Sequence, residues 1–277
     1  MKYAIGIDIG GTNTRVALVD ENLKMIDRIQ FATPADDPAA AIARITESIQ
    51  GFSVAPDALA GIGMSCPGPL DLKAGTVIVT PNLDKAWFGY PLTRVLAQAT
   101  GLPVTLENDA NLAALAEAAV GGGKDLRYVQ FLTISTGIGA GFVVDKKVYQ
   151  GAHGFACEVA NVCLWQDGPV HGALVPGGIE AIASGTAITR RATAAGLQVR
   201  HAGDVNTLAL EGNPAAQAIM ADAKQYLANF IAALIAINDP EIIILGGSVA
   251  LKIPGFVETV ETLVKEKVFV LAMVLRD

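Results

Sequence analysis

The first candidate chemistry of the chain lies near its start, in a turn that joins two apolar segments. The turn consists of Gly10, Gly11, Thr12 and Asn13, with Asp8 before it and Thr14 after it. Glycine can adopt positive φ and lets backbone N–H groups approach an anion, and threonine offers a hydroxyl. A carboxylate is a hard oxygen ligand for hydrated Mg²⁺. We therefore expect a phosphate-binding hairpin, with Asp8 binding Mg²⁺ through water. The alternative is a plain tight hairpin beside an acidic residue, because short motifs produce false positives.

A second glycine-rich turn joins another pair of apolar segments in the middle of the chain. The segments cover residues 128–135 and 140–144, and Thr136 and Gly137 begin the turn between them. This pattern repeats that of the first hairpin, which indicates a structural duplication. Two lobes that share one nucleotide are the expected arrangement.

The elements that position these turns follow from the periodicity of the apolar residues. After the first hairpin we expect a third strand at 25–31, a helix at 38–50 and a buried strand at 60–65, in the order βββαβ. Residues 66–70, Cys-Pro-Gly-Pro-Leu, break regular structure where that strand ends. Ligand loops of α/β sheets usually lie at this end of a strand, so the segment is a candidate cleft wall.

Helix and strand signals continue through the rest of the chain. A helix at 91–100 and a strand at 103–106 lead to Glu-Asn-Asp-Ala-Asn at 107–111, where an Ala/Leu-rich helix begins. An irregular stretch follows residue 151. The later predicted elements are helices at 179–194 and 214–237 and a strand at 241–245, which ends at Gly246 and Gly247.

Length and composition limit the class of protein. The chain has 277 residues, enough for two lobes with separate cores, and 52% of them are hydrophobic. No apolar run reaches the roughly 18 to 20 residues of a membrane span, and no export signal precedes Asp8, so we expect a cytoplasmic protein without a membrane partner. The net charge is −7 and there is no Lys/Arg cluster, so the sequence indicates no basic surface that would bind nucleic acid. Cys66, Cys157 and Cys163 lack metal-ligand spacing and are expected to be buried free thiols.

Four motifs, in their order and spacing, together resemble the ROK family of sugar kinases and related repressors. They are Asp-Ile-Gly-Gly-Thr-Asn at 8–13, Glu-Asn-Asp-Ala-Asn at 107–111, Ser-Thr-Gly-Ile-Gly-Ala-Gly at 135–141 and Leu-Gly-Gly at 245–247. Each motif alone is weak, but their order and spacing match across nearly the whole chain. The resemblance implies an α/β protein with two ribonuclease-H-like lobes of the actin-like ATPase fold and a central cleft. Residues 1–111 would form the N-terminal lobe, and residues 112–277 the C-terminal lobe with nucleotide-binding elements.

The resemblance also implies the ligands, ATP with Mg²⁺ and a hexose such as glucose. Asp109 is similar to the family's catalytic aspartate, which accepts the proton of the sugar's primary 6-hydroxyl. The other expected sugar-binding residues are Gly68, Asn82, Asn108, Glu158 and Glu180. The expected nucleotide-binding residues are Asp8, Gly10, Gly11, Thr12, Asn13, Thr136, Gly137, Gly246 and Gly247.

Two of these assignments have structural alternatives. Asn108 or Asp109 could simply cap the helix that begins there, and Glu180 could be an exposed acid in the first turn of a helix. A capping role and a catalytic role for Asp109 are compatible, because a helix N-terminus keeps a carboxylate ionised.

The sequence departs from the family where many members carry one His and three Cys for a structural zinc. The four corresponding residues are Asn161, His171, Ala173 and Gly178. One imidazole cannot complete a four-ligand zinc shell, so we expect no structural zinc and a loop held by packing, with Trp165, Pro169 and Pro176 as candidates. His171 is then a surface or hydrogen-bonded residue.

Two further functions compete with a sugar kinase. One is a sugar-binding regulator, although no DNA-binding segment precedes the first strand of this sequence. The other is a degenerate kinase, which the altered loop favours and the presence of Asp8, Asp109 and both glycine turns disfavours. The resemblance and the Ala-rich helices are compatible with a homodimer. Family members usually continue past the position of Asp277, so the sequence is either naturally short or truncated here. In either case some apolar surface of the C-terminal lobe is a candidate for another cover.

Overall fold

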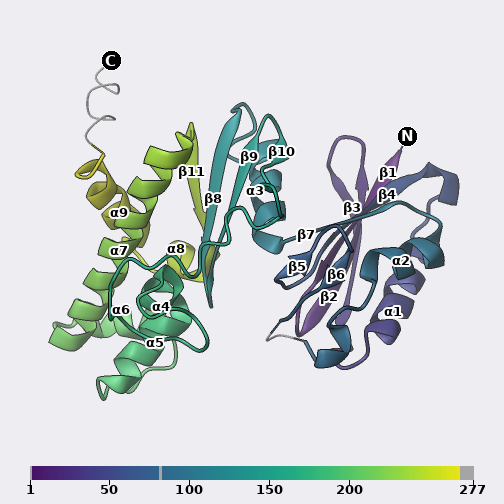
Figure 1. Cartoon of the computed structure of the whole chain (residues 1–277). Helices are drawn as coiled ribbons and strands as arrows, with labels where there is room; N and C mark the ends of the chain where they lie inside the picture. Colours follow the sequence, from purple (N-terminus) through teal and green to yellow (C-terminus); the bar gives the residue numbers. More distant parts are fainter. Residues whose placement is uncertain (1, 81–82, 269–277) are drawn as a thin grey trace. The chain divides into compact units, whose positions relative to one another are not determined.

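The computed structural model describes residues 2–80 and 83–268, and the chain divides into two compact units (Figure 1). The first unit covers residues 1–112 and the second covers residues 113–277. The division falls inside helix α3 (Asp109–Ala119), one residue from the predicted boundary. The first turn of that helix therefore belongs to one unit and its remainder to the other.

The first unit is built on a five-stranded sheet of order β3-β2-β1-β4-β7. Strands β1 to β3 form an antiparallel meander, whereas β4 and β7 run parallel to β1. The strands are β1 (Tyr3–Ile9), β2 (Asn13–Asp20), β3 (Met25–Ala32), β4 (Leu59–Ser65) and β7 (Val104–Glu107). Alternate residues Ile5, Ile7 and Ile9 are buried, as the period of a strand requires.

Helices α1 (Pro38–Gln50) and α2 (Leu92–Thr100) pack on this sheet and on each other. Asp37 caps α1 by accepting a hydrogen bond from the Ala40 N–H, and Gly101 ends α2 in the left-handed conformation. The predicted βββαβ order is confirmed. Small additional elements of this unit are β5 (Leu70–Asp71), β6 (Thr76–Val77) and 3₁₀ turns at Pro56–Ala58 and Lys85–Trp87.

The second unit repeats the strand pattern of the first. Its sheet has the order β10-β9-β8-β11, which matches β3-β2-β1-β4 in both sequence and direction. The strands are β8 (Tyr128–Ile134), β9 (Ile138–Val144), β10 (Lys147–Val148) and β11 (Ile242–Gly246). This duplication confirms the predicted fold class of two related α/β lobes.

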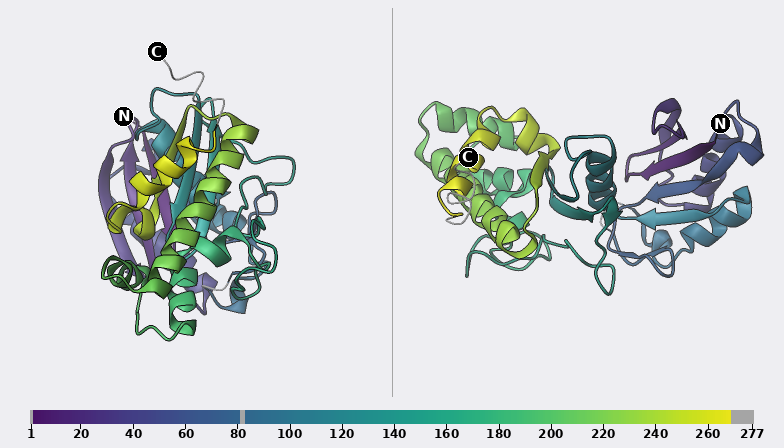
Figure 2. Two further views of the ribbon diagram at one scale, coloured as in Figure 1. Left: turned by 90° about the vertical axis from the view of Figure 1, so that its left-hand side faces the viewer. Right: turned by 90° about the horizontal axis from the view of Figure 1, so that it is seen from above.

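Helices cover both faces of the second sheet. Helix α3 packs on the face that carries Val129 and Phe131, and α7 (Pro214–Asn238) packs on the face that carries Leu132 and Ile134 (Figures 1 and 2). Because successive residues of β8 face opposite sides, its nearly continuous apolar run is buried on both.

The predicted helix over 179–194 is wrong in one respect, because Ser184 divides it. Residues Ile179–Ala183 form α4 and Gly185–Ala194 form α5, with Ser184 extended between them and its hydroxyl accepting from the Ala187 N–H. The Gly185 N–H instead donates to the Ser135 carbonyl oxygen at 2.7 Å. Three further helices lack a counterpart in the sequence analysis, namely α6 (Ala202–Leu210), α8 (Gly247–Lys252) and α9 (Phe256–Lys265).

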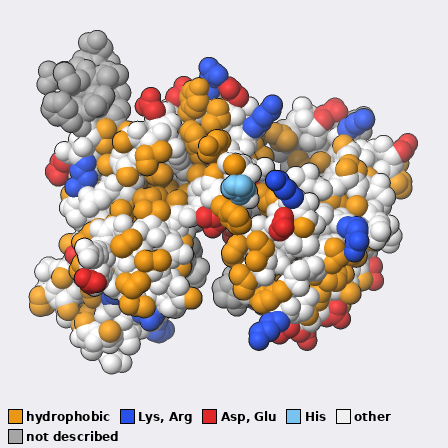
Figure 3. All heavy atoms as spheres, in the orientation of Figure 1, with side chains coloured by type: hydrophobic (Ala, Val, Ile, Leu, Met, Phe, Trp, Pro, Cys, Tyr) orange, Lys and Arg blue, Asp and Glu red, His pale blue; other side chains and the backbone are white. Residues whose placement is uncertain are grey.

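The surface carries dispersed charge. On the face drawn in Figure 3, Lys and Arg side chains lie among Asp and Glu side chains. Within residues 2–80 and 83–268, no helix combines the length and apolarity needed to cross a membrane. The three cysteines are free, but only Cys66 is buried, since Cys157 is half-buried and Cys163 is exposed. The expectation of three buried thiols is therefore wrong for the latter two.

The loop between β10 and α4 is held by direct contacts. The Asn161 Oδ1 accepts a hydrogen bond from the Val175 N–H at 2.8 Å. The backbones of Cys163 and Gly178 form an isolated antiparallel β-bridge. Trp165 stacks on Tyr226 with ring centroids 5.1 Å apart. As the sequence analysis expected of Trp165, packing contributes to the order of this loop.

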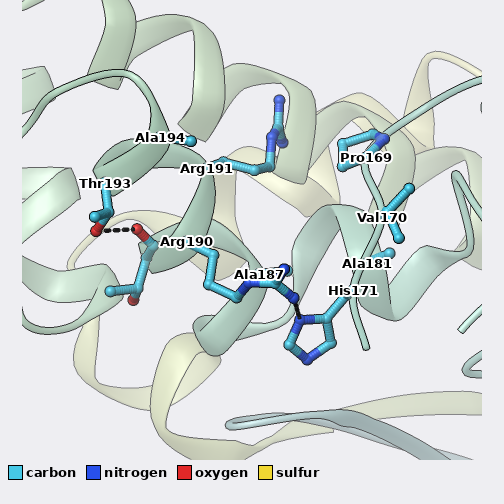
Figure 4. A pocket seen from close by; sticks show the side chains of 10 residues that line it. Pro169, Val170, His171, Ala181, Ala187, Arg190, Arg191, Thr193 and Ala194 are labelled. Atoms are coloured by element: carbon cyan, nitrogen blue, oxygen red, sulfur yellow. Dashed lines mark hydrogen bonds between the residues drawn. The ribbon is translucent and has the colours of Figure 1, made fainter. Parts of the chain in front are cut away.

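His171 lies on the same loop and points toward Arg190 of α5, with its Nδ1 in contact with an Arg190 Nη (Figure 4). Among the described residues, no group of three or more His, Cys, Asp or Glu side chains is placed to hold a metal ion. The absence of a structural zinc stays a prediction, which metal analysis can test.

We predict that the purified protein contains substoichiometric zinc and that chelation leaves its melting temperature unchanged. Metal analysis and thermal melts test this prediction. One tightly held zinc per chain, with unfolding on its removal, would contradict it.

A variant tests the hydrogen bond that Asn161 makes in this loop. Asn161→Ala should lower the free energy of unfolding by about 1 kcal/mol, because the Val175 N–H loses its acceptor. Asn161→Asp keeps that oxygen and serves as the control in the same thermal melts.

Candidate functional site

Three parallel strands of the first unit end at the same edge of its sheet. Asp8 of β1 pairs with Ser65 of β4, and Ser65 pairs with Glu107 of β7. The residues that follow β4 and β7 therefore emerge beside the Asp8 carboxylate. This edge gathers Asp8, Cys66 and Asp109, which are 58 and 43 residues apart in the chain.

The Asp8 carboxylate is oriented by two neighbours. Its Oδ2 accepts from Arg15 Nη1 at 2.7 Å, and its Oδ1 accepts from Ser65 Oγ at 2.9 Å. The side chain remains 48% exposed. Arg15 also donates through its Nε to the Gln30 side chain, so Asp8 lies at the end of a polar row across β1, β2 and β3.

The first glycine turn is braced by Thr33. Its hydroxyl donates to the Gly10 carbonyl oxygen at 2.6 Å and lies 2.9 Å from the Thr14 hydroxyl, while its N–H donates to the Thr12 carbonyl oxygen. Thr14 is fully buried, so it supports the turn and does not offer its hydroxyl to an anion as expected. Thr12 is exposed, and Asn13 is half-buried.

Gly10 serves close packing in this turn and does not adopt positive φ, contrary to expectation. A Cβ at Gly10 would lie 3.0 Å from the Asn13 carbonyl oxygen, the same atom that accepts the Gly10 N–H. The hairpin closes tightly because this position has no side chain.

Asn108 and Asp109 begin α3 and are placed by a buried acid. The Glu107 Oε1 accepts from the Asn108 N–H at 2.9 Å and from Asn111 Nδ2 at 3.0 Å, and both Glu107 and Asn111 are 4% exposed. The Ala110 N–H donates to Oδ1 of Asn108 and of Asp109, each at 2.8 Å. The capping alternative is therefore present in the structure, together with an exposed Asp109.

Charges converge at this edge. Asp109 is exposed by surface area, but atoms crowded around its carboxyl still desolvate it. This desolvation, with the negative charge of Asp8, raises the pKa of the Asp109 carboxyl, against the lowering effect of the Ala110 N–H. Burial, with smaller contributions from Asp109 and Asp8, raises the pKa of the Cys66 thiol to about 12. Asp109 is thus a carboxylate made more basic than usual, while Cys66 is a neutral thiol.

In the second unit, Glu180 clamps the turn between β8 and β9. Its Oε2 accepts from the Ile138 N–H at 2.7 Å, and a Cβ placed on Gly137 would lie 2.6 Å from that oxygen. Glu180 is half-buried rather than an exposed acid of a helix N-terminus. Only glycine fits at 137 while Glu180 keeps this position.

Gly247 continues the same region at the start of α8. Its φ is +87°, and a Cβ there would lie 2.3 Å from the Ile134 carbonyl oxygen. Gly246 has a comparable constraint, since a Cβ would lie 2.7 Å from the Phe131 ring. The next residue, Ser248, approaches Ser135 with 3.2 Å between the two hydroxyl oxygens.

A pocket of about 550 Å³ in the second unit opens beside these turns. Its volume lies within the roughly 300 to 1,000 Å³ of small-molecule sites. Hydroxyls of Ser135, Thr136 and Ser248 line one part of it. The other polar side chains in its wall are Thr186, Thr189, Arg190, Arg200, His201 and Lys252, with no carboxylate among the lining residues. Such a wall suits an anionic ligand.

The remaining residues expected to bind sugar lie outside the groups of contacts described above. Gly68 lies between β4 and β5, where a Cβ would approach the Leu70 N–H nitrogen to 3.0 Å. Glu158 is exposed on the loop before α4. Asn82 lies outside the described residues. The sequence analysis did not single out Arg15, Ser65 or Glu107, which orient Asp8 and the Asn108–Asp109 turn.

Comparison with known proteins gives concordant matches. The model of the ROK family matches residues 4–273. A glucokinase from Thermotoga maritima is 34% identical over 262 residues, covering 89% of this chain and 82% of the relative. An N-acetylmannosamine kinase from Salmonella typhi is 33% identical over 271 residues, covering 95% and 88%. These relatives are sugar kinases with different sugars in their names.

Solved structures agree with the sequence matches. A ROK hexokinase from Thermus thermophilus has a TM-score of 0.88 at 32% identity, covering 96% of this chain and 88% of the other. A Streptomyces griseus ROK glucokinase, solved with glucose and AMPPNP, has a TM-score of 0.72 at 28% identity, covering 96% and 90%. A ROK transcriptional regulator has a TM-score of 0.80 at 25% identity, covering 96% and 70%. With its duplicated sheets, its glycine turns and a family match over nearly its whole length, this chain belongs to the ROK family and is similar to the family's ATP-dependent sugar kinases.

Proposed function

We propose that this protein transfers the γ-phosphoryl group of ATP to the primary 6-hydroxyl of a hexose, glucose or a close relative. The observation that carries the proposal is Asp109, a carboxylate with a raised pKa at the sheet edge where β1, β4 and β7 end. Phosphoryl transfer needs an oriented hydroxyl, a base for its proton and groups that hold the phosphates. The described residues supply a candidate for each.

Asp109 is the proposed general base. The Glu107 carboxylate holds the backbone of the Asn108–Asp109 turn, and the Ala110 N–H fixes one Asp109 oxygen. Asn108 is proposed to bind a neighbouring sugar hydroxyl. As the 6-hydroxyl oxygen attacks the γ-phosphorus, its proton passes to Asp109, and the bond from the γ-phosphorus to the bridging oxygen breaks so that ADP leaves.

The residues present fit magnesium and ATP. Mg²⁺ usually keeps several waters and binds proteins through one or two carboxylates together with substrate phosphates, and Asp8 offers a half-exposed carboxylate for this role. The pocket beside Thr136 and Ser248, with basic and hydroxyl side chains and no acid in its wall, fits a nucleotide. Bound ATP with Mg²⁺ supplies the phosphoryl group and neutralises charge on its oxygens.

Glu180 has two proposed roles. One oxygen holds the Ile138 N–H and so fixes the second glycine turn, which we propose contacts the phosphates. A carboxylate has acceptor capacity beyond one hydrogen bond, so the same group could also bind a sugar hydroxyl. Glu158 is proposed as the second sugar carboxylate. Homodimer formation, a cytoplasmic location and the absence of nucleic-acid binding stay predictions.

A coupled assay of ADP release over a panel of hexoses tests the function. We expect Mg²⁺-dependent turnover with glucose or a relative such as mannose or an N-acetylated hexosamine, and none with a sugar that lacks its 6-hydroxyl. The competing function, a sugar-binding regulator, predicts sugar binding in calorimetry with no ADP release from any member of the panel.

Replacing the proposed base separates chemistry from binding. Asp109→Asn should lower kcat by roughly 10² to 10⁴-fold and leave sugar affinity nearly intact, because the amide accepts no proton at neutral pH. The raised pKa of Asp109 also predicts that kcat/KM of the natural enzyme falls on acidification at a higher pH than an ordinary aspartate would give. Asp71→Asn is the control and should keep full activity, because Asp71 of β5 is exposed and the amide keeps the oxygen that accepts from the Ala74 N–H. Near-normal turnover of Asp109→Asn would contradict the assignment.

Gly247 and Gly255 offer a matched pair for the nucleotide site. Both have positive φ, but a Cβ at Gly255 meets nothing within 4 Å, whereas one at Gly247 meets the Ile134 backbone. Gly255→Ala should cost about 1 kcal/mol of stability and leave the KM for ATP unchanged. Gly247→Ala should raise the KM for ATP much more than the KM for sugar. An equal rise in both, with a large drop in melting temperature, would indicate misfolding instead of a nucleotide contact.

A further inference from the structure

The hairpin turn between β9 and β10 contains two strained residues. Asp145 has φ +49° and Lys146 has φ +62°, and neither is glycine. Left-handed backbone is unfavourable for residues with a Cβ, and hairpin turns with two such residues usually contain Asn and Gly. The cost of this backbone conformation at Asp145 is offset by Arg127, whose Nε and Nη2 donate to the two carboxylate oxygens at 2.6 and 3.0 Å. Lys146 needs a separate explanation.

Four backbone carbonyls surround the Lys146 ammonium. Its Nζ lies 2.6 Å from the Ala118 oxygen, and 3.1, 2.6 and 2.8 Å from three oxygens of the following loop. Those three belong to Gly123, Lys124 and Leu126. An ammonium has three hydrogens, so four acceptors exceed its donors and the contact is that of a cation in a cage of oxygens.

This cage is formed by backbone alone and joins separate elements. Ala118 lies in the last turn of α3, where helix carbonyls carry partial negative charge and favour a cation. Residues 123–126 form the loop that returns the chain to β8. The acids nearest to these residues in sequence are engaged elsewhere or exposed. The Glu117 carboxylate accepts from the Gly122 N–H at 3.0 Å, Asp145 pairs with Arg127, and Asp125, between Lys124 and Leu126, is exposed.

We propose that Lys146 is a tethered cation that occupies a monovalent-cation site made by the carbonyls of Ala118, Gly123, Lys124 and Leu126. Carbonyl oxygens of this kind replace the hydration shell of K⁺ in cation-selective sites. The ammonium of Lys146 fills the site permanently, and its contacts compensate for the left-handed backbone of this residue. A chain without this side chain binds K⁺ or NH₄⁺ at the same position and depends on it for the order of residues 118–126.

Lys146→Gly is the informative variant, because glycine accepts the positive φ and leaves the cage open. We expect amide exchange in residues 118–126 to accelerate about tenfold or more in choline chloride, in line with the loss of a charged hydrogen bond. Added KCl or NH₄Cl should return this exchange rate, and the melting temperature, toward the values of the natural protein. The natural protein should show no such cation dependence.

Two matched variants separate the loss of the charge in the cage from other effects of substitution. Lys146→Met keeps most of the side-chain stem without its charge, so it should lose protection and recover none with K⁺. Lys147→Met removes the neighbouring lysine, which makes none of these contacts, and should behave as the natural protein. Unchanged exchange in Lys146→Gly, or a loss that K⁺ and NH₄⁺ do not reverse at constant ionic strength, would overturn the proposal. Since the readouts are protection and melting, the result is independent of kinase activity.

Discussion

The first unit depends on the common register of three parallel strands. Because Asp8, Ser65 and Glu107 lie opposite one another across β1, β4 and β7, the segments that leave these strands converge at one edge. A shift of one residue in either pairing would turn Asp8 away from Ser65 and alter the position of the Asn108–Asp109 turn. Desolvation is the main cause of the raised pKa of the Asp109 carboxyl, and this convergence adds the effect of the Asp8 charge.

The second unit uses the same strand pattern with different braces. In the first hairpin, Thr33, which directly follows β3, holds the turn with hydrogen bonds from its hydroxyl and its N–H. In the second, the Glu180 carboxylate ties the turn through the Ile138 N–H. Both braces come from segments distant in sequence. These contacts brace both turns, and the phosphate binding that we propose for them would require such pre-organised backbone N–H groups.

The loop before α4 is held by direct side-chain and backbone contacts. Asn161 supplies one acceptor to the Val175 N–H, and Trp165 anchors the loop on Tyr226 of α7. Gly177 permits the close approach, since a Cβ there would lie 1.7 Å from the Trp165 carbonyl oxygen. Packing and hydrogen bonds thus connect the loop that carries Glu158 to the helical core.

Local signals in the sequence predicted the βββαβ order, both glycine hairpins and the boundaries of α1, because strand alternation, helix periodicity and turn residues act over a few positions. The family resemblance could likewise be recognised from sequence, because it rests on four short motifs of contiguous residues. Sequence did not predict the break at Ser184, the bond of Glu180 to Ile138, the pairing of Asp8 with Arg15 or the carbonyl cage around Lys146. Each of these joins atoms whose separation is set by the packing of whole elements. The sequence alone therefore determined which residues are available for chemistry. The tertiary structure decided their partners, because only it brings distant segments together, and with them the raised pKa of Asp109 and the close packing at Gly137 and Gly247.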